Sequence, residues 1–489
     1  MKKTSLSLAV AATVAASAQA QMYIDHSNTG EVLLYPFYTA DGGNETYITV
    51  VNTTDQYKAA KVRILEAEDS KEVRDFNLYL SPYDHFSFAI SKGADGYGQL
   101  ETADVSCTVP AITGPVPFTL QLAIDAKDKN LDPSRSLQGY VEIIEMGQFK
   151  EVMGKNWLHS KGAAPAGCSK LVEAWTAGGQ WYKDAAADDV GHYGEETSWS
   201  GGGLYGVGMI VNPDKGTAMG YDAEAIDNAV TGRGAQLHYP PGSVLPNFTS
   251  DGFLTSSTIF ANGVASTFTY ADSEDAVSSV LMTGSITNEY VLDDAFDGST
   301  DWVITFPTKR RYVAGKTADL PFANPWTGDE SCDPISYQVF DREEQTIVYI
   351  PGEPLFSPAP EEEKEDIEIC YEANVVTFTK DLAAADSALF GEDPSVSEAR
   401  IQTLLKPSDF QHGWAEISFL QADLIAAYDT SFHYLPAQSG GNLGGLPAIG
   451  FAVVEFENGT LEGGSILANY QGAWEHKTLV TTSYTSSAY

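Results

Sequence analysis

Oxygen-bearing side chains crowd two short stretches of this sequence, and oxygen is the ligand type that calcium prefers. The two groups are Asp125, Asp128, Asn130 and Asp132, and Asp293, Asp294, Asp297 and Asp301. Neither stretch has the invariant glycine and terminal glutamate of an EF-hand loop. Each group is therefore either a weak calcium site of the extracellular kind or a solvated acidic turn, and Ca²⁺ is the only cofactor that the sequence suggests.

Aromatic side chains gather between about residues 148 and 200, and flat aromatic rings can stack on sugars. The five candidates for glycan binding are Trp157, Trp175, Trp181, Tyr182 and Trp199. Residues 169–175 within this stretch have helical spacing of apolar side chains. The rings either bind a glycan or form a small core of their own.

Four cysteines in the chain predict two disulfides if the protein is exported. They are Cys107 and Cys168 in the first half and Cys332 and Cys370 in the second. Three pairings are possible, and one bridge in each half is the simplest of them.

The sequence contains no G-x-S-x-G, H-E-x-x-H or P-loop motif, and its eight histidines are scattered singly. Glu142 and Glu416 stand at equivalent places in a repeat. We expect them to lie in different cores, too far apart to flank one glycosidic bond, which needs roughly 5 to 9.5 Å. The sequence therefore predicts no enzymatic activity.

The elements that position these residues are organised by a repeat. PSRSLQGYVEI at 133–143 returns as PSDFQHGWAEI at 407–417, with six of eleven positions alike in type. A glycine-bearing strand and a tight turn follow each copy, at 206–220 and at 449–463. Such self-similarity indicates a duplicated all-β unit.

Short β-branched and aromatic stretches separated by turns, as in residues 46–54 and 75–84, favour an antiparallel sandwich. We expect two tandem, duplicated immunoglobulin-like β-sandwich domains with short helical insertions. Domain 1 would span 21–240, with the aromatic-rich insertion at about 148–200. Domain 2 would span 241–489, with an acidic, proline-rich loop at about 351–366, and the two would meet near residues 236–250.

The first 20 residues read as a signal peptide, with a charged start, an apolar run and Ala18-Gln19-Ala20 as the cleavage site. Cleavage would leave Gln21 first. No later segment has the apolar length of a transmembrane helix. We expect an exported protein at the cell surface or outside the cell, with the periplasm as the alternative.

The formal charge is −39, and loss of Lys2 and Lys3 with the leader makes it −41. Such a chain repels nucleic acids and anionic lipid surfaces. Nucleic acid is therefore excluded as a partner, whereas divalent cations could bridge the surface carboxylates.

Five stretches carry a resemblance to a known group of proteins: LYPFY at 34–38, ITVVNTT at 48–54, DFNLYLSPYD at 75–84, NEYVL at 288–292 and TDWVITFPTKR at 300–310. Together they resemble a family of exported, functionally uncharacterised β-rich proteins of environmental Gram-negative bacteria. The resemblance implies an exported β protein and supplies no catalytic residue.

Two functional hypotheses follow from these observations. The first is an acidic structural or surface-layer-like protein that coats or decorates the cell, helped by calcium in self-association or in binding other envelope components. The alternative is a glycan-binding module or carbohydrate-active enzyme that uses the aromatic insertion.

Overall fold

The structure, a computed structural model, describes residues 21–121, 128–159, 163–182, 197–198, 201–230, 237–261, 263–349, 367–391, 400–407, 410–420, 433–461 and 466–482. The expected leader (1–20) and the proline-rich loop (351–366) lie outside these residues. The described chain consists mainly of antiparallel β-strands with a few short helices. The prediction of an all-β fold is therefore confirmed.

The first half of the chain forms two sheets that share a core, in the manner of a sandwich. Their strand orders are β1-β14-β2-β10-β4-β5-β8, with β11 also paired to β10, and β13-β12-β3-β6-β7-β9. The strands are β1 Tyr23–Ile24, β2 Val32–Thr39, β3 Glu45–Asn52, β4 Tyr57–Glu66, β5 Glu72–Leu80, β6 His85–Lys92, β7 Gly98–Glu101, β8 Cys107–Val109, β9 Val116–Pro117, β10 Gln138–Phe149, β11 Thr197–Ser198, β12 Leu204–Asn212, β13 Thr217–Asp222 and β14 Glu224–Asp227.

The second half forms two further five-stranded sheets, ordered β22-β21-β26-β18-β32 and β25-β24-β19-β30-β31. Their strands are β18 Ser285–Val291, β19 Gly298–Thr305, β21 Ser336–Asp341, β22 Thr346–Tyr349, β24 Ala373–Phe378, β25 Gln402–Leu405, β26 His412–Ser418, β30 Ile449–Leu461, β31 Ile466–Glu475 and β32 Lys477–Leu479. Smaller ladders are formed by β15 Ser256–Ala261, β16 Val264–Thr269, β17 Met282–Thr283, β20 Asp333–Pro334, β23 Glu368–Ile369, β27 Tyr434–Pro436, β28 Asn442–Gly444, β29 Leu446–Pro447 and β33 Thr481–Thr482.

The strand orders of the two halves correspond. The order β14-β2-β10-β4-β5 matches β32-β18-β26-β21-β22, and β13-β12-β3-β6 matches β31-β30-β19-β24, with the strands met in the same sequence along the chain. The match ends at β25, which pairs in parallel with β24, whereas β7 is antiparallel to β6. The repeated sequence motif thus places β10 and β26 at the same position in two sheets.

The glycine of each repeated motif is needed for close strand packing. A Cβ atom on Gly139 would lie 1.9 Å from the carbonyl oxygen of Leu65, and one on Gly413 would lie 1.7 Å from that of Phe340. Neither site has room for a side chain unless the neighbouring strand moves. The two glycines therefore have the same steric role in the two halves.

The helices are short: α1 Glu151–Gly154, α2 Cys168–Ala174, α3 Ser273–Leu281 and α4 Lys309–Val313, with 3-10 turns η2 Pro133–Leu137 and η3 Lys155–Trp157. Helix α2 lies where helical spacing was expected. Helix α3 is capped at its N-terminus by Asp272, whose side chain accepts the amide of Asp275 at 3.0 Å. With nine residues, α3 is the longest helix of the described chain, and none there could cross a bilayer.

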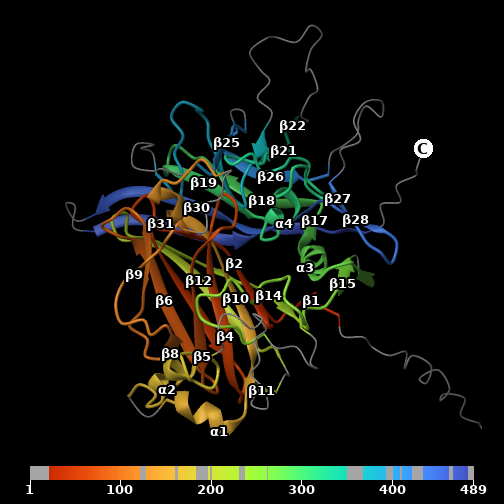
Figure 1. Ribbon diagram of the computed structural model, residues 1–489. Coiled ribbons are helices and arrows are strands. Elements are labelled where there is room, and N and C mark those ends of the chain that lie inside the picture. The colour runs from red at the N-terminus through yellow and green to blue at the C-terminus, as the bar shows by residue number, and fades with distance from the viewer. Residues whose placement is uncertain are drawn as a thin grey trace, which may run out of the picture.

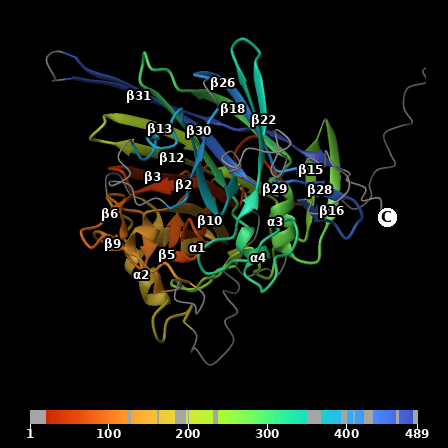
Figure 2. The same ribbon diagram turned by 90° about the horizontal axis from the view of Figure 1, so that it is seen from above.

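The second half lies across one end of the first. In Figure 1 strands β30 and β31 run over the upper end of β2, β10 and β12, while α1 and α2 lie at the opposite end. Seen from above, the labels of β31 and β13 lie close together, and these strands contact each other (Figure 2). The rings of Tyr221 and Phe451 stack across this contact with centroids 4.6 Å apart.

One hydrophobic core runs through both halves, from Met22 to Val453. Thr305 donates to the carbonyl of Pro36 at 2.6 Å between the halves. The connecting segment, residues 237–255, contains no helix or strand, but it packs against the first half instead of standing free. Its residue Tyr239 accepts a hydrogen bond from Asn77 at 2.9 Å.

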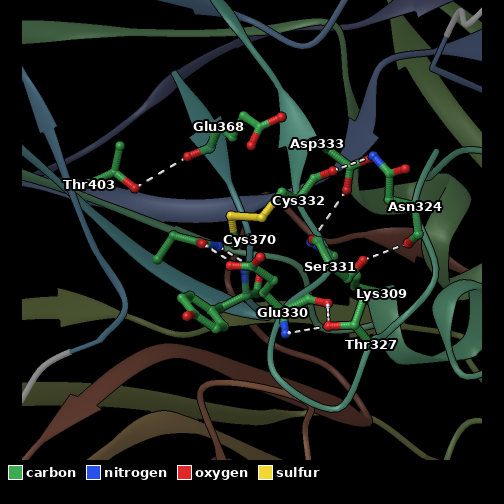
Figure 3. The surroundings of a disulfide bond; sticks show 12 residues. Lys309, Asn324, Thr327, Glu330, Ser331, Cys332, Asp333, Glu368, Cys370 and Thr403 are labelled. Atoms are coloured by element: carbon green, nitrogen blue, oxygen red, sulfur yellow. Dashed lines mark hydrogen bonds and ion pairs between the residues drawn. A yellow bond between two sulfur atoms is a disulfide. The ribbon is translucent and has the colours of Figure 1, made fainter. Parts of the chain in front are cut away.

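Both expected disulfides are present, Cys107–Cys168 and Cys332–Cys370. Figure 3 shows that the second lies beside the buried Lys309, whose ammonium donates to the carbonyl of Ser331 at 2.6 Å and pairs with Asp333 at 3.3 Å. Because Lys309 begins α4, the disulfide-bonded segment holds this helix in place.

Candidate binding site between the two halves

A cavity of about 450 Å³ lies where the first half, the connecting segment and the second half meet. Charged and aromatic side chains converge on it from separate elements. Its lining residues are Arg63, Leu65, Ser70, Glu72, Tyr140, Glu142, Val244, Asn247, Phe248, Glu274, Pro307, Thr308, Arg310, Arg311 and Ala314. A concave site with several buried titratable groups is the natural candidate for ligand binding.

The position of the cavity follows from the way one sheet face is covered. On that face of β4, β5 and β10, the end far from the second half is covered by the aromatic insertion, which packs on Ala59 and Tyr79. The connecting segment covers the middle, where Lys61 pairs with Asp75 at 2.8 Å and donates to Pro240 at 3.0 Å. The second half covers the remaining end, and the cavity lies under this cover.

Arg63 is the central charge of the first-half wall. It lies opposite Glu142 in the β4–β10 register, donates to that carboxylate at 2.5 Å, and donates to Glu72 at 2.9 Å. Burial raises the pKa of both glutamates, and Arg63 opposes this rise. Burial disfavours the charge of Arg63, yet the two carboxylates raise its pKa overall. The three groups form a buried ion cluster with fixed geometry.

Glu274 comes from the first turn of α3 and lines the second-half wall of the cavity. Burial raises its pKa to about 7, Arg311 opposes the rise, and neighbouring carboxylates, including Asp272 and Glu142, add to it. Arg311 pairs with Glu274 at 3.2 Å and with Asp272 at 2.7 Å. Near neutral pH, Glu274 can therefore either donate or accept a hydrogen bond.

Arg310 keeps guanidinium N–H groups that no described residue uses. Its guanidinium donates to the backbone carbonyls of Asp69 and Ser70, both at 3.4 Å, and forms no ion pair within the described residues. Its charge opposes the rise that burial causes in the pKa of Asp69. Nearby, Tyr140 contacts the hydroxyl of Ser70 at 2.8 Å and donates to Pro307 at 3.1 Å. A guanidinium with free N–H groups beside hydroxyl and amide groups suits an anionic ligand.

The second predicted calcium group does not converge on one point. Asp293 accepts from His412 at 3.2 Å, and the carboxylate of Asp294 pairs with Lys380. Asp297 is an exposed residue with φ of 47°. Asp301 is buried in β19, where it accepts from Thr377 at 2.6 Å, from Ser387 at 2.5 Å and from the amide of Leu389 at 2.8 Å. The structure thus does not bring the four aspartates to one point, because Asp301 is already used inside the core.

The first predicted calcium group is also divided among other partners. Asp125 lies outside the described residues. Asp128 pairs with Arg135 at 3.4 Å, Asn130 donates to Glu68 at 2.6 Å, and Asp132 caps η2 by accepting the amide of Ser134 at 2.9 Å. Within the described chain the one group of ligands close enough for a metal is Glu330, Cys332 and Cys370, whose sulfurs form a disulfide.

The aromatic insertion forms a small core instead of a sugar platform. Trp157, Trp175 and Trp181 are buried, and Trp175 donates to the hydroxyl of Tyr79 at 2.8 Å. Trp181 stacks on Tyr79 with ring centroids 6.1 Å apart. The burial of these three rings fits the small-core alternative, and glycan binding by the insertion stays a prediction. Tyr182 is 41% exposed, and Trp199 lies outside the described residues.

Glu142 and Glu416 lie in different sheets, on β10 and β26. Glu142 faces the cavity. Glu416 lies in the middle strand of its ladder, opposite Gln338 of β21 and Thr287 of β18 in the second half. The sequence analysis singled out Glu142 but missed Arg63, Glu72, Glu274 and Arg310. One available signal was the alternation of Lys61 and Arg63 with apolar residues in a strand that proves to be covered on both faces.

Comparison with known proteins adds no assignment, since no family model, curated protein or solved structure matches this chain. The resemblance to exported β-rich bacterial proteins therefore stays a prediction.

Proposed function

We propose that this chain is an exported binding protein that takes a small anionic, hydroxyl-rich ligand, such as an acidic sugar, in the cavity between its halves. The proposal rests on Arg310, a guanidinium at the cavity wall whose hydrogen-bond partners among the described residues are two backbone carbonyls. This site replaces the aromatic insertion as the place where a glycan would bind.

The other lining groups support an acidic sugar over a simple anion. The ligand carboxylate would pair with Arg310, while Glu274 and Asn247 would exchange hydrogen bonds with its hydroxyls. Phe248 offers an apolar ring to the flat face of a sugar. The cavity volume of about 450 Å³ falls in the usual range for small-ligand sites.

Isothermal titration calorimetry with D-galacturonate, and with galactose as the neutral counterpart, tests the proposal. We expect binding of galacturonate, with Arg310→Met weakening it by about tenfold or more, as loss of a charge-assisted pair implies. Arg342→Met is the matched control, because Arg342 is exposed in a distant turn. Equal binding of the two sugars, or no binding of galacturonate at millimolar concentration, would refute the proposal.

A structural role at the cell surface is the second candidate, and two observations favour it. The shared core makes the chain one body, and Tyr470 and Trp474 are 63% and 53% exposed on the edge strand β31. We propose that β31 mediates self-association or contact with another envelope component. Sedimentation should show assemblies that Trp474→Ser dissolves, whereas a monomer under all conditions would exclude a coat.

Calcium-assisted assembly can be tested in the same experiment. Calcium would have to bridge surface carboxylates of different molecules, since the predicted loops do not form a cage. The same size distribution in Ca²⁺, in NaCl of matched ionic strength and in EDTA would remove calcium from this proposal.

Export is proposed from the leader-like start and is supported by the two disulfides, which are typical of oxidising compartments. The cell surface or the extracellular space is favoured, with the periplasm as the alternative.

We also propose that the halves arose by duplication of one immunoglobulin-like sandwich. The matching strand orders and the equivalent Gly139 and Gly413 support this origin.

A further inference from the structure

A second cavity, of about 190 Å³, lies at another part of the junction. Strands β1 and β14 of the first half and β15, α3 and β32 of the second surround it, and Figure 1 shows β1, β14, β15 and α3 close together at one side of the molecule. Most of its wall is apolar, including Ile24, Phe260, Leu281 and Val480. The cavity is smaller than drug-sized sites and suits a small ligand.

Glu224 places a carboxyl group in this wall. Within the described residues it accepts no hydrogen bond and forms no ion pair, and the nearest charges that act on it are the acidic Glu475 and Asp222. Burial, followed by repulsion from these two groups, raises the pKa of Glu224 to about 7. His26 is the other titratable side chain of the cavity wall.

Taking a carboxylate out of water costs free energy, and this cost falls when a cation, a hydrogen-bond donor or a proton compensates the charge. The buried carboxylates of β4, β5 and β10 have a lysine or arginine partner, as in Lys58–Glu145 at 2.8 Å. The buried Glu31 has no cation beside it but accepts the amide of Val230 at 2.9 Å. The partly buried Glu224 has neither kind of partner among the described residues, and the cavity beside it leaves room for one from outside the chain.

We propose that this cavity binds a small alkylammonium or arylammonium ion, with the ammonium group on Glu224 and the apolar part between Ile24, Phe260 and Val480. The negative charges of Glu475 and Asp222 favour a cation at this place over a neutral amine. Phe260 lines the cavity and is 53% exposed, so its ring can contact the bound cation. This site is separate from the Arg310 cavity and does not depend on the function proposed for it.

Binding is expected to displace a proton. Below neutral pH the Glu224 carboxyl is protonated, and its O–H bond breaks when the ammonium ion arrives. The proton goes to the buffer, and the carboxylate accepts hydrogen bonds from the ammonium N–H groups. Affinity should therefore rise with pH, by about a hundredfold between pH 5 and pH 8 if Glu224 titrates near 7.

Calorimetric titration of the full chain with benzylammonium chloride in phosphate buffer tests the proposal, with benzyl alcohol as the neutral isostere. We expect benzylammonium to bind at pH 8 and the alcohol to bind at least tenfold more weakly. Glu224→Gln should weaken benzylammonium binding by tenfold or more and remove its pH dependence. Equal affinities for the cation and the alcohol, or an unchanged affinity in Glu224→Gln, would overturn it.

Two further variants separate the site from the general negative field of the protein. Phe260→Ala changes an exposed residue, so it should leave folding intact and weaken benzylammonium binding several-fold. Glu475→Gln alters a neighbouring charge outside the cavity wall and should change affinity by less than about threefold. If Glu475→Gln weakens binding as much as Glu224→Gln, the cation is held by the surface field and the proposed site is wrong.

Discussion

Two hairpin turns occupy corresponding places in the two halves and have similar acidic sequences, yet one is buried and the other is exposed. The first turn, Glu66-Ala67-Glu68-Asp69-Ser70-Lys71 between β4 and β5, is buried at every residue. The second turn, Asp341-Arg342-Glu343-Glu344-Gln345 between β21 and β22, is exposed from Arg342 onward. Composition alone therefore does not decide whether a turn is solvated.

The local structure of the two turns is nearly the same. In the first turn the Glu66 carboxylate accepts the amides of Glu68, Asp69 and Lys71 at 2.7, 3.1 and 2.8 Å. In the second turn, Asp341 accepts the amides of residues 343 and 345 at 2.9 and 2.7 Å. Each turn also contains one residue with positive φ, at positions 70 and 344.

The difference lies in distant countercharges. Arg135 pairs with Glu66 at 2.9 Å, and Arg400 pairs with Glu68 at 3.3 Å. Arg310 also reaches the carbonyl of Ser70. The second turn has no ion pair within the described chain. Burial of a charged turn is thus decided by residues far away in sequence, because each buried charge needs a partner.

The largest effect should come from removing the main countercharge of the first turn. Arg135→Met leaves the buried carboxylates of Glu66 and Glu68 without the guanidinium that pairs with them, so the free energy of unfolding should fall by about 3 to 5 kcal/mol. Arg342→Met, the matched change in the second turn, should stay within about 0.5 kcal/mol. Urea unfolding measures both, and similar values for the two variants would contradict the comparison.

Strands β10 and β26, which lie beside the two turns, should lose similar amounts of stability when their glycines are replaced. Gly139→Ala and Gly413→Ala each place a Cβ atom against a backbone carbonyl, so each should cost about 3 kcal/mol. Unfolding measurements that show one substitution to be tolerated would mean that the two strands are not equivalent.

The pH dependence of stability should report on the buried turn. Burial raises the pKa of Glu68 to about 7 and that of Asp69 to about 6. Between pH 5 and 8 the folded chain holds these protons more tightly than the unfolded chain, so the free energy of unfolding falls as pH rises, by about 4 kcal/mol for the two groups together. Glu68→Gln should reduce this slope in urea unfolding at pH 5, 6, 7 and 8, whereas Glu343→Gln in the second turn should leave it unchanged.

The smallest effect is expected at the rim of the first turn. The side chain of Arg400 is 38% exposed where it pairs with Glu68 and Asp329. Arg400→Met should therefore cost only about 1 kcal/mol, and added NaCl should shrink the difference from the unchanged protein. If Arg400→Met lowers the free energy of unfolding as much as Arg135→Met does, the Arg400–Glu68 pair is as desolvated as the Arg135–Glu66 pair.

Local patterns in the sequence predicted much of the fold. The alternation of residues 46–54 predicted β3, and four cysteines divided between the halves predicted both disulfides. The calcium groups were chosen by spacing in the chain, but Asp301 belongs to strand β19 and points into the core. Spacing along a loop does not show which side chains turn inward once a strand begins.

The binding cavity could not be predicted because its parts come from separate elements. Arg63, Glu274 and Arg310 belong to β4, α3 and α4, which are brought together only by the packing of the two halves. Lys61 and Arg63 alternate with apolar residues in β4, which is typical of a strand with one solvent-facing side, and the connecting segment that covers them has no periodic pattern. The periodicity of a strand does not show whether a segment far away in the sequence covers its polar face.

The charged first turn also has a consequence for the order of folding. The first half is made first, and its docking end then presents glutamates, an aspartate and a lysine to water beside the apolar residues of the shared core. Charges at this end oppose edge-to-edge aggregation while the second half is still missing. When the second half arrives, Arg400 pairs with Glu68, and Arg310 donates to the carbonyls of Asp69 and Ser70. We therefore expect the slow step of refolding to be the desolvation of this turn and to be accelerated by mild acid.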